Sequence, residues 1–101
     1  MLRFEIINSR EIDNYVGNPN SMIIDVRPES EYKKKHILNA INIPMEDLES
    51  SYNALPRNKL IILYCKSGGT GILAAKELFD KGFFTKSLVG GIDEYKGKYL
   101  V

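Results

Sequence analysis

A single cysteine followed by a glycine-rich stretch is the feature of this sequence best suited to chemistry. Cys65 follows the apolar segment 60–64 and begins the stretch Cys-Lys-Ser-Gly-Gly-Thr-Gly, which ends at Gly71. Glycines allow backbone conformations with positive φ, so successive N–H groups can point inward and form a nest for an anion. A thiol in such a nest, at the start of a helix, is stabilised as the nucleophilic thiolate. We therefore predict that Cys65 is a catalytic nucleophile.

The rest of the stretch is expected to bind the substrate. Lys66 adds a positive charge, the two hydroxyl side chains are hydrogen-bond donors, and the glycines offer backbone N–H groups. Thr70 can also cap the helix that follows. The predicted substrate-binding residues are Lys66, Ser67, Gly68, Gly69, Thr70 and Gly71.

Two simpler interpretations of this stretch are a structural cysteine and a phosphate-binding loop for nucleotides. Cysteine is among the most buried residue types, so Cys65 alone would indicate only a structural position. The order strand, cysteine, glycine-rich loop and helix favours a reactive thiol instead. The second interpretation, a phosphate-binding loop for nucleotides, requires a lysine after the last glycine, whereas Lys66 precedes all three glycines.

Composition limits the other functions that the chain can have. With 101 residues and a formal net charge of +1, we expect one domain, residues 1–101, without nucleic acid or membrane partners. One cysteine and one histidine, His36, predict no disulfide, no metal site and no cofactor. Segment 1–7 has no long apolar run and is not expected to be a signal peptide. We expect a cytoplasmic monomer.

Short apolar runs that alternate with amphipathic stretches predict the elements that position Cys65. Strands are expected over 4–7, 22–27, 40–43, 60–64 and 86–89, and helices over about 9–16, 28–35, 45–52, 71–80 and 92–96. Ser9 is the expected N-cap of the first helix, and Pro28 the first residue of the second. This alternation predicts a three-layer α/β/α fold around a mostly parallel sheet of about five strands. Ligands bind beyond the carboxyl ends of such strands, where Cys65 lies.

Four segments of the chain, in the right order, resemble the rhodanese family of sulfurtransferases. Segment 65–71 resembles the family's active-site loop, commonly Cys-Arg-Ser-Gly-x-Arg-Ser, and segment 24–27 its Asp-Val-Arg strand end, followed by the acidic-aromatic pair 31–32. Segment 36–44 resembles the family's Gly-His-Ile-x-Gly-Ala-x-Asn-Ile-Pro stretch, and segment 88–95 its Gly-Gly-aromatic segment. The match spans nearly the whole chain and implies a single-domain thiosulfate sulfurtransferase with a rhodanese-like fold.

The resemblance implies that Cys65 takes the outer sulfur of a donor, thiosulfate or a persulfide, and becomes a persulfide itself. The sulfur would then pass to an acceptor outside the chain, which is cyanide, a small thiol or a thioredoxin-like protein. Thr70 and Gly71 stand where many members have arginine and serine, so Lys66 is the only charged side chain of the loop. This departure leaves open an alternative function, a persulfide carrier or partner-docking module without efficient thiosulfate turnover.

Asp25 and Arg27 end a predicted strand near the loop, and we expect a supporting role for them, through contacts with the loop backbone or with Glu31. His36 lies far from the loop in the sequence and is expected to be structural. A phosphatase, the other enzyme class with this kind of cysteine loop, needs an arginine at the position of Gly71. No arginine follows Cys65, so phosphatase activity is not expected.

Overall fold

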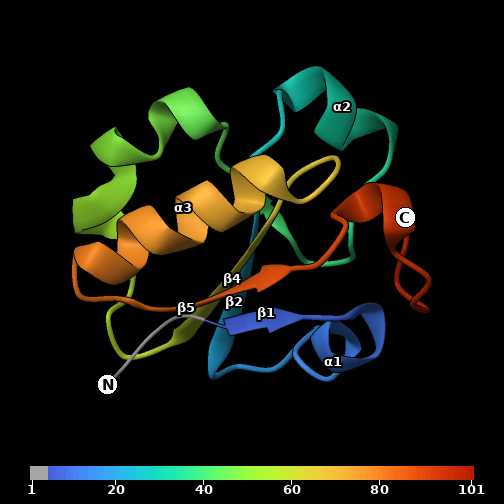
Figure 1. The fold of residues 1–101 in the computed structure, drawn as a ribbon, viewed down its shortest axis with the longest axis horizontal. Helices are drawn as coiled ribbons and strands as arrows, with labels where there is room; N and C mark the ends of the chain where they lie inside the picture. Colours follow the sequence, from blue (N-terminus) through green and yellow to red (C-terminus); the bar gives the residue numbers. More distant parts are fainter. Residues whose placement is uncertain (1–4) are drawn as a thin grey trace.

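A five-stranded parallel sheet forms the centre of the protein, seen in a computed structural model that describes residues 5–101 (Figure 1). The strands are β1 (Glu5–Ile7), β2 (Ser21–Asp25), β3 (Ile41–Asn42), β4 (Leu60–Tyr64) and β5 (Phe84–Leu88), in the order β1-β5-β4-β2-β3. The α-helices are α1 (Ser9–Asp13), α2 (Glu29–Lys34) and α3 (Gly69–Asp80), and the 3-10 helices are η1 (Met45–Asp47), η2 (Glu49–Ala54) and η3 (Ile92–Glu94). All neighbouring strands run parallel, which confirms the predicted fold class.

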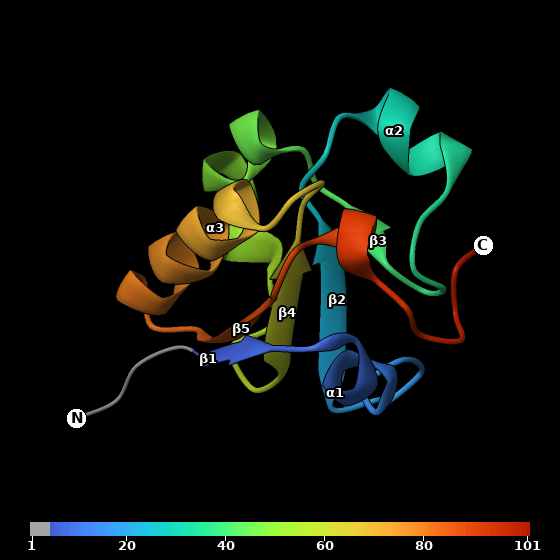
Figure 2. The ribbon, with the colours of Figure 1, turned by 45° about the vertical axis from the view of Figure 1, so that its right-hand side comes forward.

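The central strand β4 is buried on both faces, which explains its unbroken apolar sequence. Ile61 and Leu63 belong to one core, beneath α3, whereas Ile62 and Tyr64 belong to a second core that includes residues of α1 and η3. Figure 2 shows α3 and the green 3-10 helices on one side of the sheet and α1 and the red η3 on the other. The chain thus has the three layers that the sequence predicts.

Capping determines where the first helix begins. Asn8, and not the predicted Ser9, is its N-cap, because the Asn8 side chain accepts a hydrogen bond from the Glu11 N–H at 2.9 Å. The Glu11 carboxylate accepts the Asn8 N–H in return, at 3.2 Å, which completes a capping box. The helix ends at Asp13, short of the predicted residue 16.

Two other helix starts also differ from the predictions. Pro28 is the N-cap of α2 and not its first helical residue. Helix α3 begins at Gly69, earlier than predicted, and its N-cap is Gly68 and not Thr70. Gly68 has a φ of 106° and a ψ of −29°, a left-handed conformation that glycine adopts without strain.

The predicted helix 45–52 is instead the pair of 3-10 helices η1 and η2, joined at the buried Leu48. The apolar residues that reach the core are spaced by three from Met45 to Leu48 and from Tyr52 to Leu55, which suits three residues per turn. Strand bounds also differ from the predictions: β2 is Ser21–Asp25, not 22–27, β3 is only Ile41–Asn42, and β5 covers 84–88, not 86–89. Of the predicted first strand, residue 4 lies outside the described residues.

Candidate active site

Strand β4 brings Cys65 to the carboxyl edge of the sheet, as predicted. Figure 2 shows that the loop after β4 leads directly into α3. The Cys65 side chain is largely buried, with 5% of the residue exposed. The backbone N–H of Gly68 donates a hydrogen bond to the Cys65 sulfur at 3.0 Å. Because Gly68 also caps the 12-residue α3, the positive end of the helix dipole lies beside this sulfur. The site can therefore hold negative charge on sulfur.

Gly71 lets the first turn of α3 pack closely against the end of β4. A Cβ atom at Gly71 would lie 3.3 Å from the backbone nitrogen of Cys65 and equally close to the Ser87 hydroxyl and the Tyr64 Cα atom. Gly71 and Gly68 are both buried. This position of Gly71 behind the loop fits a packing function at least as well as substrate binding.

The outer side of the loop is open to solvent. The exposed residues of the loop 65–71 are Lys66, Ser67, Gly69 and Thr70. These are the loop residues that a substrate approaching from outside would meet first, so their assignment to substrate binding remains a prediction that fits the geometry.

The segment after β5 holds the cysteine loop from the other side, a contact that sequence reasoning missed. The carbonyl oxygens of Cys65 and Lys66 accept hydrogen bonds from the N–H groups of Ile92 and Asp93, each at 2.9 Å. Gly91 makes this approach possible, because its φ of 61° and its missing side chain leave room for the loop backbone. The Gly-Gly pair before Ile92 was the available signal, although no sequence pattern named its partner.

Lys66 does not present a free charge to the sulfur, because its ammonium group forms an ion pair with Asp93. The Lys66 Nζ and Asp93 Oδ2 atoms are 2.8 Å apart. The hydrogen bond to Asp93 and the charge of that carboxylate raise the pKa of Lys66, and the charge of Glu31 adds to this. Lys66 is therefore a cation whose charge is already balanced.

Asp25 and Arg27 bind each other, and the predicted pairing with the loop backbone or Glu31 was wrong. Arg27 donates to both carboxylate oxygens of Asp25, with 2.8 Å between Nη2 and Oδ2, and to the Lys35 carbonyl oxygen at 2.6 Å. Glu31 pairs with Lys34 instead. A guanidinium matches a carboxylate in two-point contact, so Asp25 is the preferred partner of Arg27.

The Asp25–Arg27 pair lies beside the strand that carries Cys65, and its supporting role stays a prediction. Asp25 is fully buried and Arg27 is 5% exposed. The guanidinium carbon of Arg27 lies 5.8 Å from the ring centre of Tyr64, the residue before Cys65. The Asn42 side chain adds hydrogen bonds to the carbonyl oxygens of Asp25 and Arg27, at 3.0 and 2.9 Å.

The contacts of His36 fit the structural role expected for it. Its ring stacks on Tyr32 with 3.9 Å between ring centres, and its Nδ1 atom is 2.9 Å from the Tyr32 carbonyl oxygen. Within residues 5–101, no cluster of three or more His, Cys, Asp or Glu side chains has the arrangement of a metal site. In the same range, no helix has the length and apolar character needed to span a membrane.

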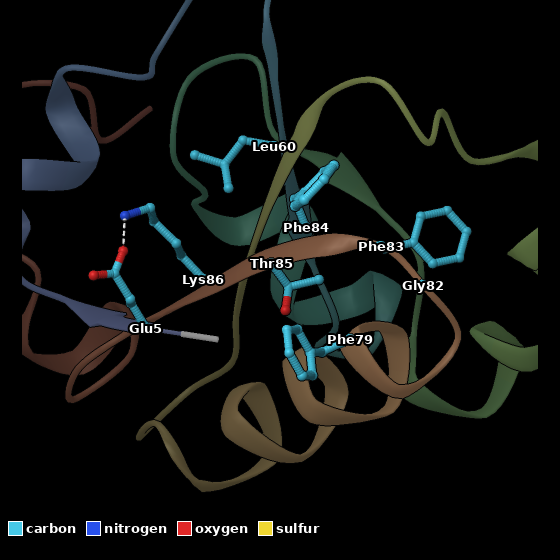
Figure 3. Close-up of a pocket in the computed structure, with 8 residues that line it drawn as sticks. All are labelled: Glu5, Leu60, Phe79, Gly82, Phe83, Phe84, Thr85 and Lys86. Carbon is cyan, nitrogen blue, oxygen red and sulfur yellow. Dashed lines mark hydrogen bonds and ion pairs between the residues drawn. The ribbon is translucent and has the colours of Figure 1, made fainter. Parts of the chain in front are cut away.

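An apolar cavity of about 290 Å³ lies apart from the cysteine loop, near the amino ends of β4 and β5 (Figure 3). Its lining comprises Glu5, Leu60, Phe79, Gly82, Phe83, Phe84, Thr85 and Lys86. Glu5 and Lys86 form an ion pair at its rim. No residue of the loop 65–71 contributes to this lining, so the cavity is not part of the cysteine site.

Comparison with known proteins finds relatives over most of the chain. A tRNA sulfurtransferase of Desulfurococcus amylolyticus is 46% identical over 88 residues, which are 87% of this chain but only 17% of that protein. The thiosulfate sulfurtransferase GlpE of Coxiella burnetii is 28% identical and aligns over 97% of this chain and 92% of its own length. A rhodanese-related protein of Thermoplasma volcanium superposes with a TM-score of 0.87, at 26% identity, over 97% of this chain and 98% of that one. Residues 8–98 match the family described as "Rhodanese-like domain", and the chain belongs to this family.

Proposed function

We propose that the protein moves a sulfane sulfur from a donor, thiosulfate or a persulfide, to an external thiol or cyanide through a persulfide on Cys65. The observation that carries this proposal is the hydrogen bond from the Gly68 N–H to the Cys65 sulfur at the start of α3. This contact stabilises an anionic sulfur without any charged side chain. Membership of the rhodanese-like family and the names of the relatives support the same reaction class.

The reaction runs in two displacements that balance in atoms and electrons. The Cys65 thiolate attacks the outer sulfur of the donor; a new S–S bond forms, the S–S bond of the donor breaks, and the leaving group takes the electron pair. With thiosulfate this leaving group is sulfite. The acceptor then attacks the outer sulfur of the Cys65 persulfide, and the Cys65 thiolate is restored. A thiol acceptor lies outside these 101 residues, because they hold one cysteine.

A second candidate is a persulfide carrier or docking module with slow thiosulfate turnover. The Lys66–Asp93 ion pair favours it, because the only charged side chain of the loop is balanced by a carboxylate. The relative named tRNA sulfurtransferase contains the matching region as a small part of a longer protein, which is compatible with such a role. We further propose a monomeric, cytoplasmic domain over residues 1–101, with a thioredoxin-like protein as one class of acceptor.

Intact-protein mass spectrometry after incubation with thiosulfate tests the proposal. We expect a gain of about 32 Da, one sulfur atom, that is absent in Cys65→Ala and is removed by cyanide or a thiol. A persulfide donor is tested in parallel. Loading by the persulfide alone would identify the carrier, whereas failure of both donors would leave only a docking function.

A further inference from the structure

The only charged side chain of the loop 65–71, Lys66, is paired with a carboxylate. Lys66 is 68% exposed and extends to Asp93, which is itself anchored because its backbone N–H donates to the Lys66 carbonyl oxygen. Glu31 also acts on the Lys66 ammonium. The lysine is therefore held by the same segment that positions the loop.

Arg27 cannot replace the lysine. No arginine follows Cys65 in the sequence, and Arg27 is buried in its pair with Asp25. Around the sulfur, favourable interactions with an anion come from backbone N–H groups and the helix dipole. These groups carry only partial positive charges, whereas a free lysine would add a full one.

The two donor classes differ in the charge that they bring to this loop. When a thiolate attacks thiosulfate, the two reactants together bring three negative charges to the loop: Cys–S⁻ and S–SO₃²⁻ give Cys–S–S⁻ and SO₃²⁻. When a thiolate attacks a protonated persulfide, the reactants bring one negative charge, because Cys–S⁻ and R–S–SH give Cys–S–SH and R–S⁻. In each case the thiolate electron pair forms the new S–S bond, and the pair of the broken S–S bond leaves with sulfite or R–S⁻. With Lys66 paired to Asp93, repulsion disfavours the dianion most.

We propose that Asp93 is a specificity-determining residue that makes this protein select persulfides of thiols over thiosulfate, by holding the charge of Lys66. The inference rests on the proposed function and names the donor class of the same site. Asp93 acts through Lys66 and does not touch the reacting sulfur atoms.

The test compares rates of sulfur loading on Cys65, followed by intact mass, from thiosulfate and from 2-hydroxyethyl persulfide. The wild type is expected to load faster from the persulfide. Asp93→Asn frees Lys66 and is expected to raise the thiosulfate rate about three- to tenfold at low salt, with little change in the persulfide rate. High salt should reduce this gain. Adding Lys66→Gln to Asp93→Asn should remove it.

Glu94→Gln is the matched control. Glu94 is the exposed neighbour of Asp93, so this variant removes the same charge while the Lys66–Asp93 pair stays intact. Three results would overturn the inference and leave the sulfurtransferase function standing. They are an equal gain in thiosulfate rate in both variants, no such gain in Asp93→Asn, and faster wild-type loading from thiosulfate than from the persulfide. Loading by neither donor would overturn the proposed function, and this inference with it.

Discussion

Gly91 packs so closely against Lys66 that a Cβ atom on Gly91 would lie 2.5 Å from the Lys66 carbonyl oxygen. Its backbone, with a φ of 61° and a ψ of −160°, lies in a region that only glycine occupies readily. This close approach lets the Ile92 N–H reach the Cys65 carbonyl oxygen at 2.9 Å. The position of the cysteine therefore depends on a residue 26 positions later in the chain.

Replacing Gly91 by alanine should displace the cysteine loop. We expect a loss of about 2–4 kcal/mol in the free energy of unfolding, from backbone strain and the clash with the Lys66 carbonyl, and slower sulfur loading of Cys65. Urea unfolding and mass spectrometry measure the two effects. Gly69→Ala is the control for stability, since a Cβ there meets no atom within 4 Å, and it should unfold at the same or higher urea concentration. Equal stability of both variants would contradict the contact.

Gly68→Ala should impair the chemistry more directly. Alanine resists the φ of 106° found at Gly68, and its Cβ would lie 3.1 Å from the Gly90 nitrogen. The N–H that donates to the Cys65 sulfur would turn away, and we expect sulfur loading to slow by about tenfold or more. Stopped-flow or quenched mass measurements of the first loading step give this rate. Loading at the wild-type rate would show that the hydrogen bond is not needed.

The sequence predicted the elements whose signal is local. Strand β4 begins and ends where expected, because apolar residues facing two cores leave an unbroken run. Cys65 then lies at the strand end by chain continuity alone. The N-cap of α1 was missed by one residue, since Asn8 and Ser9 are both good caps and only the reciprocal contact of Asn8 with Glu11 decides between them.

Contacts between distant segments could not be predicted in the same way. The pairing of Lys66 with Asp93 joins two polar residues that each look like ordinary exposed positions. The partner of Arg27 was also assigned wrongly, because its strong two-point contact with Asp25 depends on how β2 ends and not on a spacing rule. Such choices depend on three-dimensional packing, which composition and periodicity do not report.

Breaking the Asp25–Arg27 pair should destabilise the protein without a matching effect on chemistry. Arg27→Met leaves the buried Asp25 carboxylate without its partner, and we expect a loss of about 3–5 kcal/mol in the free energy of unfolding. The double variant with Arg27→Met and Asp25→Leu should lose less free energy of unfolding than the two single variants lose together. A double-mutant cycle by urea unfolding measures this difference. At low temperature, where the variants remain folded, sulfur loading should stay near the wild-type rate. A large loss of loading in fully folded Arg27→Met would instead place this pair in the reaction.

The hydroxyl of the buried Tyr95 should make the free energy of unfolding depend on pH in the alkaline range. Its hydroxyl donates to Asp13 and accepts the Tyr99 N–H at 3.0 Å, and burial, with the hydrogen bond to Asp13, raises the pKa of Tyr95 to about 12. The folded protein thus keeps this proton at a pH where the unfolded chain, with a tyrosine pKa near 10, has lost it. Its contribution is fully present below about pH 10 and is lost as the pH rises toward 12.

Tyr95→Phe removes both the hydrogen bonds and the titrating group, so it should behave differently at the two ends of this pH range. At neutral pH we expect a loss of about 1 kcal/mol in the free energy of unfolding. Above pH 10 the stability of the variant should decline less steeply than that of the wild type, because one of the protons released on unfolding is gone. Urea unfolding at a series of pH values gives both quantities. Tyr52→Phe is the parallel case, since burial and the hydrogen bond to Glu77 raise the pKa of Tyr52 to about 12 as well. An alkaline decline in Tyr95→Phe as steep as in the wild type would show that Tyr95 does not hold its proton in the folded state.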